Sequence, residues 1–209
     1  MKRRRGQGED GFTLIELLVS IVILGVVMSG VAAVVISYLK DTNSTIGRLQ
    51  ESHDAQISAA YFTQDVESVG VRATATPFAL QSSIDNSGSG SWPYPCATAG
   101  TTPVIRFAWN DYVDTAGDFD QIRVAYVQNT AHSELHRLTC KNNATVATDT
   151  LLAHELDPAN QPTTSCSSAC GFGTTTLPAT VSLTLRIKDQ YHVGGTFAVT
   201  LTGHPRQAT

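Results

Sequence analysis

Charged residues are scarce in this sequence. Only 15% of its 209 residues are Asp, Glu, Lys or Arg, and the formal net charge is −4. No basic stripe or basic, aromatic-rich motif follows the first five residues, so no nucleic-acid partner is expected. The chain also lacks a G-x-S-x-G elbow, a phosphate-cradling loop and an H-E-x-x-H pair. We therefore expect no enzyme and no cofactor.

One long stretch lacks proline and nearly lacks charge. Residues 12–36 form an apolar run that a single acid, Glu16, interrupts near its start. As a helix this run would extend roughly 37 Å, more than a hydrocarbon core of about 30 Å. Because Met1-Lys2-Arg3-Arg4-Arg5 precedes it, we predict a single-pass segment in the bacterial cytoplasmic (inner) membrane, with everything after Tyr38 extracytoplasmic.

Glu16 distinguishes this run from simpler membrane segments. A secretory signal would have a shorter apolar region of about 7–15 residues and a small-residue cleavage site beyond it. The small residues 29–32 lie inside the run instead. A plain membrane anchor explains the length and orientation but leaves Glu16 without a role. An ionisable residue in such a span costs a few kcal/mol and indicates a functional partner.

The run opens with the string Gly11-Phe12-Thr13-Leu14-Ile15-Glu16-Leu17-Leu18-Val19-Ser20. This string closely resembles the cleavage and methylation signature of type IV prepilins and type II secretion pseudopilins. The resemblance implies that a prepilin peptidase cuts between Gly11 and Phe12 and then N-methylates Phe12. The sequence departs from the family at Glu9 and Asp10, where basic or small residues are more frequent.

The family's processing gives Glu16 a physical role. A new helix N-terminus carries an ammonium group, unpaired N–H donors and the positive end of the helix dipole. Glu16 follows Phe12 by four residues, and side chains lean toward the helix N-terminus. Its carboxylate could meet the ammonium group of its own chain or that of a neighbouring subunit. We favour the neighbour, which makes Glu16 an assembly residue and not a catalytic one.

Helical spacing continues beyond the apolar run. We predict one helix from about Phe12 to Val69, weakened near residues 41–44, where side chains compete for backbone hydrogen bonds. Its second half should pack an apolar stripe against a sheet. The stripe has apolar or aromatic members at spacings of three and four: Ile46, Leu49, His53, Ile57 and Tyr61, followed by Phe62, Val66 and Val69.

The remainder of the chain has the pattern of a β-rich head. Residues 73–102 are loop-like, and alternating or short apolar segments predict strands near 104–109, 120–127, 134–140, 181–187 and 196–201. The fold class is therefore α+β, and the resemblance implies the pilin fold, a long N-terminal helix on an antiparallel sheet. The domains would be a cleaved basic leader at 1–11, a transmembrane and filament-core helix at 12–38, its amphipathic continuation at 39–70, and an extracytoplasmic head at 71–209.

A narrower resemblance concerns residues 61–70 and the strand order that ends in Leu138 and Cys140. Both are similar to the larger minor pilins of the W type and to minor pseudopilin J. This implies a subunit that helps to initiate or cap a type IV pilus or a type II secretion pseudopilus. Its partners would be other pilin or pseudopilin subunits, the prepilin peptidase and the membrane, through residues 12–36.

The alternative function is that of a membrane-tethered or pilus-tip adhesin that uses the loops at 73–119. Pilus, secretion and competence systems share the leader motif, so they remain undistinguished.

Four cysteines, Cys96, Cys140, Cys166 and Cys170, all follow the membrane segment. An even number of extracytoplasmic cysteines favours disulfides. Three pairings are possible, and we prefer Cys96–Cys140 with Cys166–Cys170. A zinc site would need two closely spaced pairs, and only one loose pair is present.

Two further groups have metal-binding residue types. Asp111, Asp114, Asp118 and Asp120 are weak calcium candidates, because their spacing differs from that of an EF-hand. His132 and His136 stand four residues apart, but the alternation around them predicts a hairpin, where they would not share a helical face. We therefore expect no metal site.

Overall fold

The computed structural model describes residues 12–86, 88, 91–113, 118–188 and 196–206. It contains one helix, α1 (Leu14–Ser68), and the strands β1 (Ile84–Asp85), β2 (Thr101–Tyr112), β3 (Phe119–Asn129), β4 (Glu134–Lys141), β5 (Val146–Ala153), β6 (Thr163–Cys166), β7 (Val181–Lys188) and β8 (Thr196–Gly203). The chain divides into two compact units, one that ends at Thr45 and one that begins at Ile46.

The described part of the first unit is the first half of α1. Residues 12–41 are all exposed, although most of them are apolar. The most apolar window of α1 has a mean hydropathy of 2.8, so the helix is long and apolar enough to cross a membrane. No weakening interrupts it near 41–44. The Thr42 and Thr45 hydroxyls donate to the carbonyls of Tyr38 and Asp41, one turn earlier, and leave the helix continuous.

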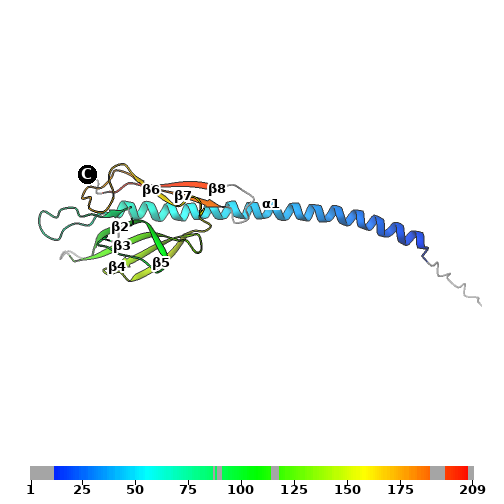
Figure 1. Cartoon of the computed structure of the whole chain (residues 1–209), viewed down its shortest axis with the longest axis horizontal. Helices are drawn as coiled ribbons and strands as arrows, with labels where there is room; N and C mark the ends of the chain where they lie inside the picture. The colour runs from blue at the N-terminus through cyan, green and yellow to red at the C-terminus, as the bar shows by residue number, and fades with distance from the viewer. Residues whose placement is uncertain (1–11, 87, 89–90, 114–117, 189–195, 207–209) are drawn as a thin grey trace, which may run out of the picture. The chain divides into compact units, whose positions relative to one another are not determined.

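In the second unit, antiparallel strands form two sheets along the second half of α1 (Figure 1). The larger sheet has the order β1-β2-β3-β4-β5, and the smaller has the order β6-β7-β8. Figure 1 shows the larger sheet on one side of the helix and the smaller sheet on the other. The expected α+β class, a long N-terminal helix with antiparallel sheets, is confirmed.

Three aromatic rings join α1 to the larger sheet. Phe62, Phe107 and Tyr126 are fully buried and meet edge to face, with ring centroids 5.6–5.9 Å apart. Such pairs contribute about 0.5–1.5 kcal/mol each beyond the burial of their area. The smaller sheet adds its inward face to the same core through the alternate side chains of β7, Val181, Leu183, Leu185 and Ile187.

The predicted apolar stripe on α1 is wrong in its first turns. Ile46 and Leu49 are 46% and 66% exposed, and His53 is exposed as well. From Phe62 onward the stripe is as predicted, because Phe62 and Val66 are fully buried. Between residues 46 and 58, α1 therefore turns toward the sheets a different face from the one that the spacing of apolar residues predicts.

Polar side chains, Asp54 and Ser58, occupy the buried face of α1 in this part of the helix. Asp54 accepts hydrogen bonds from the backbone N–H of His154 at 2.8 Å and from Gln50 Nε2 at 2.8 Å. The Ser58 hydroxyl donates to the carbonyl of Leu152 at 3.2 Å. Both partners on the sheet side belong to the end of β5 or follow it directly. Burial of these polar groups is tolerated because each finds a partner there.

The predicted strands are present, and most are longer than the pattern indicates. β2 extends from Thr101 to Tyr112, and β3 pairs with it along its whole length. The strands β1, β5 and β6 are not among those predicted from the sequence. β5 was missed because its sequence, VATDTLLA, alternates poorly, and its middle residues are exposed.

Close packing of β8 on α1 requires glycine at position 203. A Cβ there would lie 2.6 Å from Val66 Cβ. We expect Gly203→Ala to lower the free energy of unfolding by about 1–3 kcal/mol, the usual cost of overpacking a core. Chemical denaturation of the full chain in detergent, followed by tryptophan fluorescence, measures the change. Gly171→Ala is the control, because its Cβ would meet only Asn86 Oδ1 at 3.7 Å. Equal stability of the two variants would contradict this packing.

Candidate functional site

The start of α1 is closed by a reciprocal pair of side chains. Thr13 directly precedes the helix, and both its backbone N–H and its hydroxyl donate to Glu16 Oε2, at 3.0 and 2.9 Å. The backbone N–H of Glu16 lies 3.3 Å from Thr13 Oγ1, to which it donates. This arrangement is a capping box, in which two otherwise unpaired backbone donors are satisfied at once.

The capping box gives Glu16 a partner within its own chain. This contact was not predicted, although Thr13-Leu14-Ile15-Glu16 has the T-x-x-E spacing typical of capping boxes. In this uncleaved chain the nitrogen of Phe12 is a peptide amide, so no ammonium group is present for Glu16 to meet. The box therefore holds the carboxylate at the helix start, ready for a second partner.

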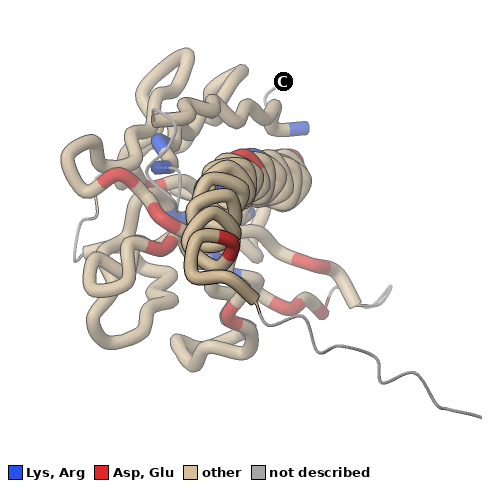
Figure 2. The backbone as a smooth tube through the Cα atoms, turned by 90° about the vertical axis from the view of Figure 1, so that its right-hand side faces the viewer, with Lys and Arg blue, Asp and Glu red and all other residues tan. Residues whose placement is uncertain are grey.

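Glu16 is the only charged residue among residues 12–39. Figure 2 looks along the helix from its N-terminal end, where the nearest turns are tan apart from a red segment. Phe12 is 83% exposed, and it shares one face of the helix with Glu16 and Ser20. This face is open for another helix. The cleavage residue Gly11 lies outside the described residues.

A buried ion pair fastens α1 to the larger sheet. Arg137 on β4 donates to Asp65 on α1 through Nε at 2.7 Å and through Nη2 at 2.6 Å. The Tyr126 hydroxyl on β3 donates to the same carboxylate at 2.7 Å. The Arg137 guanidinium also lies over the Tyr61 ring, 4.9 Å from its centroid. Burial and the neighbouring Asp65 charge raise the pKa of Tyr126 well above its ordinary value, so the phenol remains a donor.

A second buried ion pair joins β1 to β2, where Asp85 and Arg106 are cross-strand partners beside the loop that follows β1. Asp85 accepts from Arg106 Nε at 2.9 Å, and Arg106 lies 5.7 Å from the centroid of the Trp92 ring. Asp85 is fully buried. Removing one partner of such a pair leaves an uncompensated buried charge, which costs about 3–5 kcal/mol. The loop is therefore a fixed part of the head.

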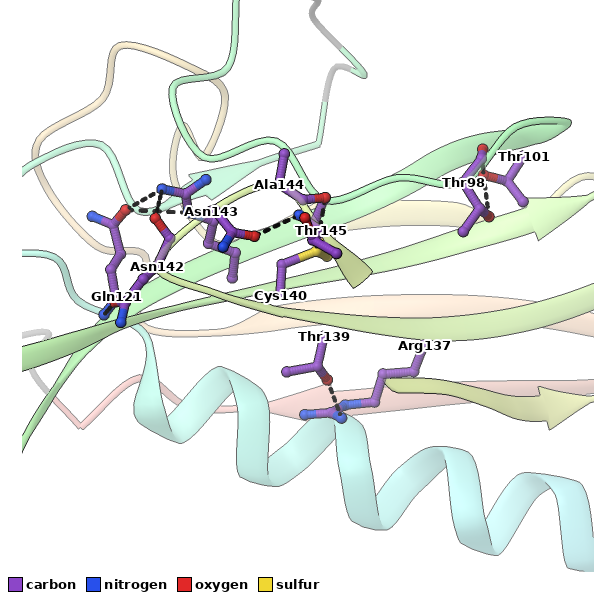
Figure 3. Close-up of a disulfide and its surroundings, with 12 residues drawn as sticks. Thr98, Thr101, Gln121, Arg137, Thr139, Cys140, Asn142, Asn143, Ala144 and Thr145 are labelled. Carbon is purple, nitrogen blue, oxygen red and sulfur yellow. Dashed lines mark hydrogen bonds between the residues drawn. A yellow bond between two sulfur atoms is a disulfide. The ribbon is translucent and has the colours of Figure 1, made fainter. Parts of the chain in front are cut away.

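Two disulfides complete the attachment of loops to the head, Cys96–Cys140 and Cys166–Cys170. These are the two pairs preferred from the sequence. Figure 3 shows Cys140 beside the turn after β4, where Asn143 Oδ1 accepts from the backbone N–H of Thr145. Arg137 and Thr139 directly flank Leu138 on β4. Their side chains point toward α1, on the face of the strand opposite to that of Cys140.

Two of the weak calcium candidates stand opposite each other on neighbouring strands, without a third carboxylate among the described residues to complete a site. Asp111 and Asp120 face each other across the β2–β3 pair. Asp120 pairs with Lys141 Nζ at 2.6 Å and accepts from Asn142 Nδ2 at 2.7 Å, and these contacts lower its pKa. Asp114 lies outside the described residues. Among the residues that the structure describes, no group of three or more His, Cys, Asp or Glu side chains is arranged to hold a metal ion.

The two candidate histidines lie on a β-hairpin, as the alternation predicts. His132 lies in the turn between β3 and β4, and His136 lies on β4. His136 bonds through Nδ1 to Asp149 at 2.7 Å and through Nε2 to Glu134 at 3.1 Å. Burial alone would lower the pKa of His136, but these two carboxylates outweigh it and raise the pKa. His136 is thus part of a surface charge network on the sheet.

Comparison with known proteins identifies the N-terminal signal. Residues 1–32 match the family model described as the prokaryotic N-terminal methylation motif. This motif is the prepilin-type signal of type IV pilins and pseudopilins, so the resemblance of residues 11–20 is confirmed. A search of the curated proteins gave no match. The signal, the membrane-length helix and the antiparallel head together support a protein of the type IV pilin and pseudopilin class.

The two disulfides should differ in their contribution to stability. Cys96–Cys140 joins residues 44 apart, whereas Cys166–Cys170 joins residues only 4 apart. On chain-entropy grounds the longer loop contributes about 4 kcal/mol and the shorter about 2 kcal/mol. Chemical denaturation should therefore show the larger loss for Cys96→Ser with Cys140→Ser. An equal or larger loss for Cys166→Ser with Cys170→Ser would contradict this order.

Proposed function

We propose that this chain is a minor pilin or pseudopilin that helps to initiate or cap a type IV pilus or a type II secretion pseudopilus. The observation that carries the proposal is the prepilin-type signal at residues 1–32, which includes the start of an exposed apolar helix and its acid, Glu16. Such a helix needs lipid or the helices of other subunits around it. The chain is then a substrate of the prepilin peptidase and not itself an enzyme.

Processing would divide the chain at its signal. The peptidase cuts between Gly11 and Phe12 and N-methylates Phe12, so residues 1–11 leave as the leader. Residues 12–38 then lie first in the inner membrane and later in the fibre core. The continuation at 39–70 and the head at 71–209 remain extracytoplasmic, where the two disulfides are stable.

Glu16 would direct assembly through its charge. Before assembly the capping box satisfies two backbone donors at the helix start and holds the carboxylate in place. After cleavage, the free amine of a neighbouring subunit gives the carboxylate an opposite charge. An unpaired ionised group inside a membrane costs a few kcal/mol, so pairing favours the assembled state by an amount of that order.

The tip or priming role rests on the head. The disulfide Cys96–Cys140 fixes the long segment before β2, and a buried ion pair joins β1 in this segment to β2, which suits a terminal subunit. The adhesin alternative is favoured by exposed apolar side chains within or beside the loops at 73–119. Tyr112 and Val113 at the end of β2 are 60% and 65% exposed.

Replacing Glu16 by glutamine tests the proposal, because it removes the charge and keeps the shape. We expect Glu16→Gln to be inserted and cleaved normally but to appear in sheared fibres at about one tenth of the normal level or less, which is a loss of about 1.4 kcal/mol or more. Quantitative immunoblotting of membrane and fibre fractions measures this.

Thr13→Val is the matched control, because it removes the hydroxyl of the capping box and keeps the charge of Glu16. It should enter fibres far better than Glu16→Gln. Normal fibre incorporation of cleaved Glu16→Gln would overturn the assembly role. A tethered adhesin predicts that surface display and binding survive this substitution.

A further inference from the structure

Strand β8 forms an open edge of the smaller sheet. It pairs with β7 from Thr196 to Gly203, and no strand lies on its other side among the described residues. Its sequence, TFAVTLTG, contains no charged residue and no proline. Natural proteins usually protect long edge strands with charge, proline or extreme shortness, because an open edge pairs readily with other chains.

The other edges are short, or, in β5, carry a charged residue, Asp149, and contact α1 at one end. β1 and β6 have only 2 and 4 residues. The end of β5 contacts α1, since the Ser58 hydroxyl donates to the carbonyl of Leu152. The C-terminal end of β8 also lies against the helix, where Thr63 Oγ1 donates to the carbonyl of Thr202 at 3.5 Å. The open part is therefore residues 196–201, about 20 Å of extended backbone.

The inward-facing apolar side chains of the smaller sheet are buried on β7 but are incompletely covered on β8. Ile187 on β7 is only 2% exposed, but Phe197, its direct neighbour on β8, is 41% exposed. Val199 stands opposite the fully buried Leu185 and is itself only partly buried. Both β8 side chains belong to the inward-facing set, so the layer lacks cover on the side away from β7.

A groove of about 540 Å³ lies beside these residues. Phe197 contributes to one wall, and α1 supplies the other lining residues. Three of those are small side chains, Ser52, Ala55 and Ala59, and they leave room above the helix for larger side chains. The remaining lining residues are Arg48, Glu51 and Gln56.

We propose that the β8 edge and this groove together bind an extended segment of another pilin-class subunit, which pairs as a fourth strand of the smaller sheet. Main-chain hydrogen bonds to residues 196–201 supply affinity, and alternate side chains enter the groove and supply specificity. This inference rests on the proposed function, which places other subunits of the class beside the head.

The chemistry of the site defines the segment. Its inward side chains are apolar, because they complete the layer of Phe197 and Val199 above the small residues of α1. Its outward side chains are uncharged and polar, to continue the hydroxyl pairs between Thr184 and Thr200 and between Ser182 and Thr202. A charged inward side chain would lose its hydration against Phe197 and Val199, and these apolar side chains offer it no hydrogen bond or opposite charge.

A peptide with the sequence of residues 196–202 is a suitable model strand, because β8 itself has the required alternation. We expect it to bind the full chain in nanodiscs saturably, as measured by fluorescence anisotropy. Ala55→Leu fills the groove and should weaken binding at least about tenfold, or about 1.4 kcal/mol. Ala60→Leu adds the same volume at an exposed position of α1 outside the groove and should leave binding unchanged.

The same peptide with N-methylated alternate amides cannot form the main-chain ladder and should not bind. Binding of this peptide, or equal binding to Ala55→Leu and Ala60→Leu, would overturn the proposed site. The assay needs neither cleavage after Gly11 nor fibre growth, so its result is independent of the Glu16→Gln experiment.

Photo-crosslinking identifies the occupant. A benzoylphenylalanine introduced in place of Ala198 on the exposed edge, in the native host, should cross-link to a protein with a prepilin-type signal, as identified by mass spectrometry. The same replacement at Ala60 is the control. Cross-links only to second copies of this chain, or only to proteins without that signal, would overturn the assignment to another subunit.

Discussion

The structure depends on one carboxylate near the start of an apolar helix. Glu16 would be costly in lipid without a partner, and Thr13 provides the first one through the capping box. The box leaves the negative charge uncancelled. In the proposed function, an amine from a neighbouring subunit would relieve the remaining cost, so the residue that is costly in the single chain would favour the fibre. The exposed apolar surface of residues 12–41 acts in the same direction, because it too needs lipid or other helices.

The second half of α1 solves a different physical problem. It serves as the shared core of two sheets, which bury the ring of Phe62 and the side chain of Val66 between them. Two carboxylates on the helix, Asp54 and Asp65, are buried there because strand residues satisfy them. These contacts fix which face of the helix each sheet covers. The smaller sheet ends at β8, and the groove lined by Phe197 and α1 lies beside this strand.

Local patterns predicted much of this fold, and long-range partners account for what they missed. The run from Phe12 predicted a helix because it is continuously apolar and free of proline, and residues 181–187 predicted a strand because they alternate with a period of two. The burial of Asp54 was not readable, because its partner His154 lies 100 residues away and donates through its backbone. β5 was missed for a related reason: its side-chain pattern is weak, and its pairing with β4 determines it. The capping box of Thr13 and Glu16 was readable from its spacing and was overlooked.

The central claim is that cleavage after Gly11 creates an N-methylated amine at Phe12, the group that Glu16 of a neighbouring subunit would then bind. Intact-mass analysis of the protein purified from membranes and from fibres, with fragmentation of its N-terminus, tests this most directly. The account predicts a chain that begins at Phe12 and carries one methyl group on the Phe12 nitrogen. A mature chain that keeps residues 1–11, or that begins at any other residue, would contradict it.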